Sequence, residues 1–225
     1  MKKSVMIICL MSLSIVTTIK AQELPPLHRL ELGARFMPTF SSFDMKTSTG
    51  GTIKGDVTLG YGVGAMMGFN FSNHFGMQAE VIYNSLSQKY KDQGLQREIN
   101  VRYINIPLLM SLNTGTSKPV NLRIVFGPQF GLNVGSSITG SASSSDTLKT
   151  VLAIRKGDIG FAYGAGLGFA LNSTRTIRLD LGFRGVYGFV NISNTNQTAA
   201  TDSYYILDRA VVKTKSAYIG ITFLL

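Results

Sequence analysis

The stretch TLGYGVGAMMGFNF, residues 58–71, decides the fold. Its odd-numbered positions, from Leu59 to Phe71, are all apolar or aromatic, whereas glycine holds most of the even-numbered positions between Thr58 and Asn70. Successive side chains of a β-strand point to opposite faces, so this period of two predicts a strand. One face of that strand is apolar and the other carries almost no side-chain volume.

The same alternation recurs eight times downstream of Gln22. The predicted strands lie within residues 29–36, 58–71, 75–84, 97–112, 121–134, 158–171, 177–188 and 218–225. The composition agrees, because the 225 residues include 24 glycines and only 15% charged side chains, which is unusual for a water-soluble domain. It is natural where one face of every strand meets lipid, and the fold class is therefore predicted to be all-β.

The connections between these strands alternate in length. Short turns are predicted at residues 72–74, 113–118 and 172–174, and long polar links at 41–56, 89–96, 135–156 and 190–208. Short periplasmic turns and long extracellular loops are typical of outer-membrane barrels. The pattern predicts an eight-stranded antiparallel up-and-down transmembrane β-barrel with both termini in the periplasm.

A secreted soluble β-sandwich or lipocalin-like barrel is the alternative fold. Its apolar face would point inward, and its other face would carry the Lys, Glu, Asp and Thr of a wetted surface, whereas here that face is rich in glycine. A helical membrane span is excluded on length, because no run of 18 apolar residues follows the N-terminal segment. The last strand, with Phe223 and a terminal Leu225, resembles the signal that barrel-assembly machinery recognises.

The N-terminus has the features of a signal peptide. Lys2 and Lys3 precede an apolar run, and the small Ala21 marks the expected cleavage site, so the domains are a signal peptide, 1–21, and a barrel, 22–225. Cleavage removes Cys9, the only cysteine, and leaves 19 of the 22 basic residues against 12 acidic ones. Export makes nucleic acid an improbable partner for this basic chain, and we expect it in the outer membrane of a Gram-negative bacterium.

Three segments carry a family resemblance. They are Tyr103 to Leu109 (YINIPLL), Gly127 to Gly131 (GPQFG), and Asp158 to Gly160 (DIG) with Gly164 and Gly166. On these residues the chain resembles the PorT-like family of outer-membrane β-barrel proteins. The resemblance implies a barrel fold and an outer-membrane location, and some family members support protein secretion. Asn105 stands where the family often has glutamate, so no role for an acid is carried over there.

Charged residues on the glycine-rich face predict a polar core inside the barrel. The inward-facing charges are Glu31, Arg35, Glu80, Arg123, Arg178, Asp180 and Arg184. They fall on alternate strands, so long side chains can lie across the glycines of the strands between them. Opposite charges are expected to pair, because an unpaired buried charge is costly to desolvate. The competing interpretation is that these groups line a wet, weakly selective pore.

Two prolines conflict with a regular closed barrel. Pro107 and Pro128 cannot donate to a strand ladder, and a closed barrel has no edge strand to accommodate them. A β-bulge near each one is the expected resolution.

Catalysis finds little support in the sequence. The only histidines, His28 and His74, fall at the predicted periplasmic end, away from the outer rim where a lipid-modifying enzyme or protease would meet its substrate. We therefore predict no catalytic residues, cofactor or metal. The favoured function is a structural or assembly-supporting scaffold that binds protein or lipid partners, with secretion-machinery proteins among the candidates. A narrow passive pore for small solutes is the alternative, and an outer-rim enzyme comes third.

Lys213 and Lys215 are candidate lipid contacts. Both fall in the outward phase of the last strand, near the outer end of the barrel, where basic side chains outnumber acidic ones. They are predicted to bind the lipid phosphates of lipopolysaccharide as point charges. The alternative is that they are solvated lysines with no specific partner, because exposed ion pairs are individually weak.

Overall fold

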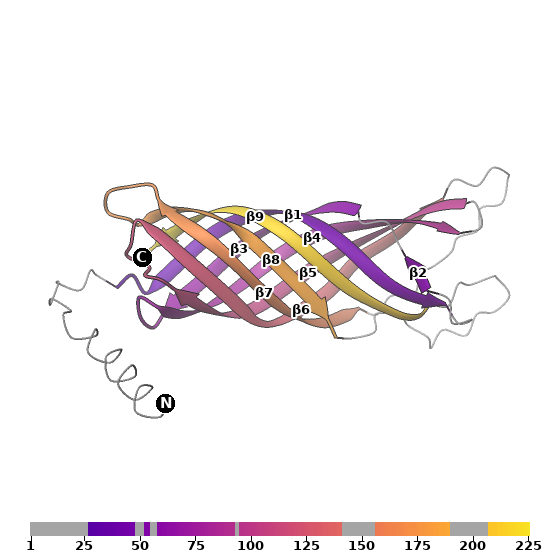
Figure 1. Ribbon diagram of the computed structural model, residues 1–225, viewed down its shortest axis with the longest axis horizontal. Coiled ribbons are helices and arrows are strands. Elements are labelled where there is room, and N and C mark those ends of the chain that lie inside the picture. Colours follow the sequence, from indigo (N-terminus) through magenta and orange to yellow (C-terminus); the bar gives the residue numbers. More distant parts are fainter. Residues whose placement is uncertain (1–26, 48–51, 55–57, 93–94, 141–155, 190–206) are drawn as a thin grey trace, which may run out of the picture.

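The protein is a closed antiparallel β-barrel in the computed structural model (Figure 1). The structure describes residues 27–47, 52–54, 58–92, 95–140, 156–189 and 207–225, so the predicted signal peptide lies outside the described residues. The strands are β1 (Leu30–Thr47), β2 (Thr52–Lys54), β3 (Thr58–Asn70), β4 (Phe75–Asp92), β5 (Leu95–Asn113), β6 (Val120–Gly140), β7 (Gly157–Ala170), β8 (Ile177–Gly188) and β9 (Leu207–Leu224).

Eight of these strands form the wall. The order around the barrel is β1, β3, β4, β5, β6, β7, β8, β9, and pairing of β1 with β9 closes it. The short β2 pairs with β1 only, at residues Asp44 to Lys46. The predicted eight-stranded antiparallel barrel is thus confirmed. Among the described residues, no helix is long and apolar enough to cross a membrane.

The two ends of the barrel differ. Residues 71–74, 114–119 and 171–176 connect strands at one end, here called the turn end, where the C-terminus also lies (Figure 1). The opposite end is called the loop end. The turn-end connections match the predicted short turns to within two residues at each boundary.

Three of the four predicted long links are wrong in their extent. The structure continues β1 to Thr47, β4 to Asp92 and β6 to Gly140, and it resumes at Leu95, where residues 41–56, 89–96 and 135–156 were expected to be loops. Polar sequence favours a loop, but backbone pairing continues the ladder there, as between Lys89 and Glu98. Where a strand extends beyond the apolar exterior, its outward side chains no longer need to be apolar. The alternation of apolar and polar residues therefore stops before the strand ends.

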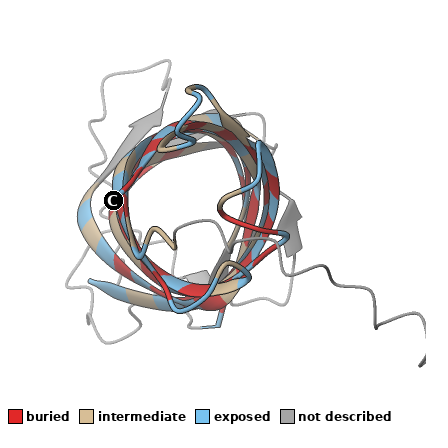
Figure 2. Ribbon diagram, turned by 90° about the vertical axis from the view of Figure 1, so that its left-hand side faces the viewer, coloured by how far each residue is buried: buried red, intermediate tan, exposed pale blue. Residues whose placement is uncertain are grey.

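Burial alternates along the wall as the glycine-rich pattern predicts. In β3 and β7 the inward positions are buried or half-buried, and the outward positions are exposed except for the half-buried Phe169 (Figure 2). The exposed outward side chains are large and apolar over every wall strand, including Leu59, Val81, Ile124, Phe183 and Phe223. A continuous apolar exterior around a polar interior is what a lipid-embedded barrel requires.

The prolines do not cause the bulges that the sequence suggested. The pairing register is the same before and after Pro107, and the same is true of Pro128. Backbone pairs are missing only at each proline and on one side: toward β4 at Pro107 and toward β5 at Pro128. The one register shift between β5 and β6 lies between Arg102 and Tyr103 instead. Each proline removes one ladder donor, and the strand on its other side still pairs with it. A local gap is therefore sufficient.

Candidate functional site

All seven charged residues predicted to face inward are buried inside the barrel. Their exposed fractions lie between 1% and 7%: Glu31, Arg35, Glu80, Arg123, Arg178, Asp180 and Arg184. Such burial is rare for Asp, Glu and Arg unless the groups are paired. The pattern of partners therefore decides what the interior can do.

Glu80 on β4 is the centre of one cluster. Its carboxylate accepts from Arg35 on β1, with Nη1 2.6 Å from Oε1, and from Arg184 on β8, with Nη2 3.0 Å from Oε1 and Nη1 3.2 Å from Oε2. The amide of Gln78 also donates to Oε1. One acid thus holds two guanidinium groups. The charge-assisted bonds to Arg184 involve both carboxylate oxygens, which fixes the orientation of the group.

Glu31 on β1 is the centre of a second cluster. Arg123 on β6 places Nη2 2.7 Å from Oε2 and 2.8 Å from Oε1, and the amide of Asn70 donates to Oε1 at 2.9 Å. Arg123 also donates from Nε to Asn113 at 3.0 Å and from Nη1 to Gln78 at 3.4 Å. Since Gln78 contacts Glu80 as well, the two clusters form one connected network.

Both clusters cross the full width of the barrel. In the circular order of eight wall strands, β1 and β6 are four strands apart, and so are β4 and β8. The pairs Glu31 with Arg123 and Glu80 with Arg184 therefore join diametrically opposite walls. Sequence reasoning expected charges to pair across one intervening glycine strand. Arg35 with Glu80 does so across β3, but Arg123 does not pair with the charges of β8 across β7. A lumen this narrow brings an arginine within reach of the far wall.

Arg178 and Asp180 form no ion pair within the described part of the chain, contrary to the expectation that opposite charges would meet. Arg178 instead donates to the carbonyl oxygens of Thr116, Lys118 and Gly168, and Asp180 accepts from the hydroxyl of Thr222 at 2.5 Å. The carbonyls exposed by the tight turn at residues 114–119 compete with Asp180 for the guanidinium. Arg178 thereby holds that turn against the barrel mouth.

Tyr218 is an interior residue that is absent from the set of charged residues predicted to face inward. Its ring reaches from β9 over two glycines, because a Cβ at Gly166 or Gly182 would overlap the phenol. The guanidinium of Arg35 lies over the ring, with Cζ 4.8 Å from the ring centroid. The sequence signal is present, since Tyr218 stands in the inward row of its strand, and the glycine-rich row of β7 lies two strands away. The charge pattern alone could not detect it.

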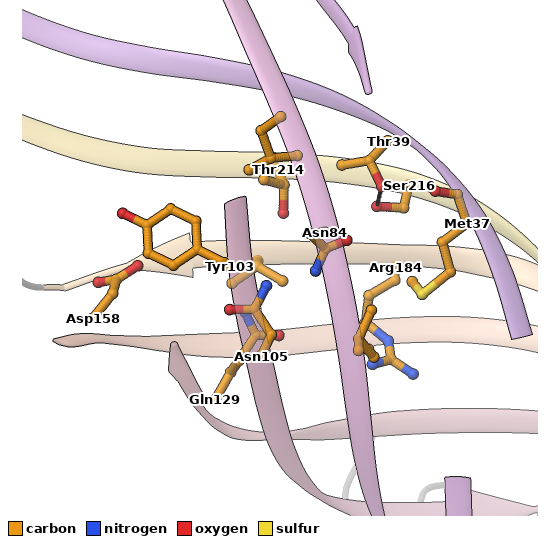
Figure 3. Close-up of a pocket in the computed structure, with 13 residues that line it drawn as sticks. Met37, Thr39, Asn84, Tyr103, Asn105, Gln129, Asp158, Arg184, Thr214 and Ser216 are labelled. Atoms are coloured by element: carbon orange, nitrogen blue, oxygen red, sulfur yellow. Dashed lines mark hydrogen bonds between the residues drawn. The ribbon is translucent and has the colours of Figure 1, made fainter. Parts of the chain in front are cut away.

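A cavity of about 30 Å³ lies in the loop-end half of the lumen. Arg184 borders it, and so do Tyr103, Asn105, Gln129 and Asp158 from the three strands β5 to β7 (Figure 3). Roughly two water molecules would fill such a volume. The cavity adjoins the charge network at Arg184, and the loop-end half of the lumen that contains it is here called the hollow half.

The remaining candidate residues lie on the rim and exterior. His28 and His74 lie at the turn end, where their backbone carbonyls accept hydrogen bonds from Asn70 and Asn113. Lys213 and Lys215 lie in the outward phase of β9, opposite Tyr187 and Gly185 of β8. The ammonium of Lys213 lies 5.1 Å from the ring centroid of Tyr187.

Comparison with known proteins agrees with this architecture. Similar solved structures include the outer membrane protein OprG from Pseudomonas aeruginosa (12% identity, 88% of this chain and 96% of that chain covered, TM-score 0.54). Others are Neisserial surface protein A (14% identity, 87% and 97% covered, TM-score 0.46) and the outer membrane enzyme PagL (12% identity, 81% and 97% covered, TM-score 0.35). No curated protein sequence matches the chain.

The likeness to OprG shows the fold alone, since one barrel fold hosts many functions. A family model described as "Outer membrane protein beta-barrel domain" matches residues 20–194, which is most of the chain. The chain therefore belongs to the outer membrane protein beta-barrel domain family.

Proposed function

We propose that the protein is a non-enzymatic, non-conducting scaffold of the outer membrane, whose loops or turns bind protein or lipid partners. The proposal rests on two ion pairs, Glu31 with Arg123 and Glu80 with Arg184, that cross the lumen from one wall to the opposite wall. An eight-stranded barrel is only wide enough to be filled by side chains. Ion pairs that cross such a narrow lumen twice would obstruct the path of a solute.

Single-channel recording in planar lipid bilayers tests this proposal. The refolded protein is expected to give no steady openings. The matched control is Arg123→Ala with Arg184→Ala, which shortens both crossing side chains and is expected to raise the conductance of the refolded fraction. Steady openings of the unmodified protein would overturn the proposal.

A narrow passive pore is the second candidate. The observation in its favour is the polar cavity in the loop-end half of the lumen, which would be one part of such a path. Openings that vanish when the cavity is filled, for example by Gly131→Leu, would establish this alternative. An enzyme at the outer rim has less support, because His28 and His74 lie at the turn end.

The proposed topology places the turn end in the periplasm and the loop end outside a Gram-negative cell, after cleavage of the signal peptide behind Ala21. N-terminal sequencing of the membrane-inserted protein is expected to begin at Gln22. Cleavage elsewhere, or an uncleaved chain, would correct the domain boundary. Protease shaving of intact cells should cut loop-end segments and spare the short turns.

We also propose that the protein is PorT-like and meets secretion-machinery proteins at its turn end. The three segments that carry this resemblance lie on neighbouring strands, β5, β6 and β7, and Asn105, Gly131 and Asp158 pair in register across them. A photo-crosslinker at exposed Lys118 in intact cells should reproducibly capture a secretion-machinery protein, while one at lipid-facing Leu181 should not. Equal capture at both positions would remove the support for a turn-end partner.

A further inference from the structure

The three connections at the turn end are tied to one another by hydrogen bonds. Thr116 donates from its backbone N–H to the carbonyl of Asn73 at 3.1 Å, and from its hydroxyl to the side-chain oxygen of Asn73 at 3.0 Å. Arg175 on the third turn donates from Nη1 to the carbonyl of Ser117 at 2.8 Å. The three turns therefore form one connected surface.

The side chains exposed on this surface carry positive charge. The exposed cations are Arg29, Lys118 and Arg175, and neither the three turns nor the described residues before β1 contain an acidic side chain. The nearest acids on the adjoining strands, Glu31 and Asp180, are buried and hydrogen-bonded inside the lumen. Three exposed cations against the single C-terminal carboxylate leave the turn end positive.

Two of these cations, Lys118 and Arg175, lie over the barrel mouth. Thr116 is only 1% exposed, and Arg178 inside the lumen donates to its carbonyl, so the turn that contains Thr116 bends inward. Figure 2 looks onto this end and shows connections that bend over the mouth. The side chain of Lys118 lies along the same turn, because a Cβ at Gly115 would be 3.1 Å from its carbons. The two cations therefore face water at the mouth and not the lipid beside the wall.

Arg175 has a backbone conformation that is unfavourable for arginine. Its φ is +60°, and no other non-glycine residue in the described part of the chain has a positive φ. Glycine and asparagine adopt this left-handed region at a lower cost. Backbone strain of this kind concentrates at functional sites. The turn thus retains a charged side chain where a smaller residue would fit the backbone better.

We propose that the turn end is a docking surface for an acidic, extended segment of a periplasmic protein, whose carboxylates bind Lys118 and Arg175. A guanidinium can hold a carboxylate by two parallel hydrogen bonds, and an ammonium adds a point charge. Arg29 precedes β1, which lies opposite β6 in the barrel, so a segment that crosses the mouth from Lys118 would reach it. This inference rests on the turn-end partner proposed above and names the chemistry that recognises it.

NMR titration of the full barrel in phosphatidylcholine nanodiscs tests the proposal. Hexaglutamate at low salt should shift the amide signals of residues 114–119, hexaglutamine should not, and added salt should weaken the response. Lys118→Gln with Arg175→Gln should weaken binding of hexaglutamate at this turn about fivefold or more. Lys213→Gln with Lys215→Gln, which removes two charges at the loop end, is the matched control and should leave the Kd at this turn unchanged.

A second variant separates binding from folding. Arg175→Asn removes the charge and places a residue that tolerates the positive φ, so it should leave the unfolding midpoint about unchanged. It should weaken binding of hexaglutamate about threefold, because one of the two cations over the mouth is lost. A lower midpoint together with unaltered binding would mean that the arginine serves only the turn, and it would contradict the proposal.

Three further results would overturn the proposal. The first is an equal response to hexaglutamate and hexaglutamine. The second is an equal Kd for hexaglutamate in the Lys118 and Arg175 double variant and in the unmodified protein. The third is turn-end signals that respond to phosphatidylglycerol in the nanodisc but not to peptide, which would make this surface a membrane contact.

Failure of this inference is distinguishable from failure of the proposed partner. Capture of a protein at Lys118 in cells, without selective binding of hexaglutamate, would keep the turn-end partner and reject its acidic character. Selective binding without capture would keep the preference of the surface for carboxylates and remove the support for a secretion-machinery partner.

Discussion

The two halves of the lumen treat buried charge in opposite ways. Toward the turn end, Glu31 and Glu80 each accept several charge-assisted bonds and hold three arginines between them. Toward the loop end, Asp158 lies beside a cavity with Oδ1 unsatisfied. The same strands build both halves, so the difference comes from which side chains occupy the inward row at each height.

This difference predicts that the two halves contribute unequally to the stability of the barrel. A paired and hydrogen-bonded charge fixes the positions of the strands that carry it, and removal of one partner leaves the other buried without compensation. An unsatisfied carboxylate beside a cavity holds no partner in place, so it contributes little to the fold. We therefore expect the turn-end half to hold the barrel together and the loop-end half to tolerate change.

The largest expected effect is at Glu80. Glu80→Gln leaves Arg35 and Arg184 buried without their shared counter-charge, and it should lower the free energy of unfolding by about 3–5 kcal/mol. Urea unfolding of the refolded barrel in lipid vesicles would measure this loss. Asp158→Asn is the matched acid-to-amide change in the hollow half, and it should alter stability far less. Similar losses in the two variants would show that the halves do not differ.

The second expected effect is at the turn end, where Arg178 donates to three carbonyl oxygens. Arg178→Gln should cost about 1.5–3 kcal/mol, because charge-assisted hydrogen bonds are lost and the carbonyls of Thr116 and Lys118 lose their donor. Hydrogen exchange should quicken in the turn at residues 114–119. Arg175→Gln, which removes one exposed bond to Ser117, is the control and should change exchange only slightly. Unaltered hydrogen exchange in Arg178→Gln would mean that the conformation of this turn does not depend on Arg178.

The third expected effect tests how tightly the glycine rows are packed. A Cβ at Gly64 would lie 2.9 Å from Ile82 Cγ1, and one at Gly164 would overlap the carbonyl oxygen of Phe183. Gly64→Leu and Gly164→Leu should each cost about 1–3 kcal/mol by overpacking. Heat-modifiable gel migration and the unfolding midpoint would report it. Gly157→Leu enters open space and should behave like the unmodified protein. If all three behave alike, the lumen is not packed at these heights.

The sequence predicted the wall of the barrel because the wall depends on local rules. Each strand shows its two faces by a sequence period of two. The inward face of residues 58–71 is mostly glycine, which indicates that side chains from neighbouring strands fill the lumen beside it. The same alternation identified the inward charges, including Arg184 and Asp180. The strand ends beyond the apolar layer, as at Thr47 and Asp92, carry no such period and were missed.

The partners inside the lumen could not be predicted from the sequence. Pairing of Glu31 with Arg123 depends on the diameter of the closed barrel and on the tilt of its strands, which bring two distant side chains to the same height. The competition of turn carbonyls for Arg178 depends on how the turn at residues 114–119 folds. The convergence of Tyr103 and Asp158 on Gly131 requires the register of three strands together.

The smallest expected effect concerns the exterior of the loop-end half. Lys213 and Lys215 point outward from β9, and the ring of Tyr187 lies beside Lys213, as is common where a strand passes from lipid to headgroups. We propose that both lysines contact lipid phosphates. Each basic residue near an anionic surface adds about 1 kcal/mol, so Lys213→Gln with Lys215→Gln should weaken binding of lipopolysaccharide micelles roughly fivefold to thirtyfold at low salt. The effect should shrink as ionic strength rises, because the charges are screened. Lys118→Gln, a change of an exposed lysine at the turn end, should leave that affinity unaltered. Equal affinity of the double variant and the unmodified protein at low salt would mean that these lysines are simply solvated.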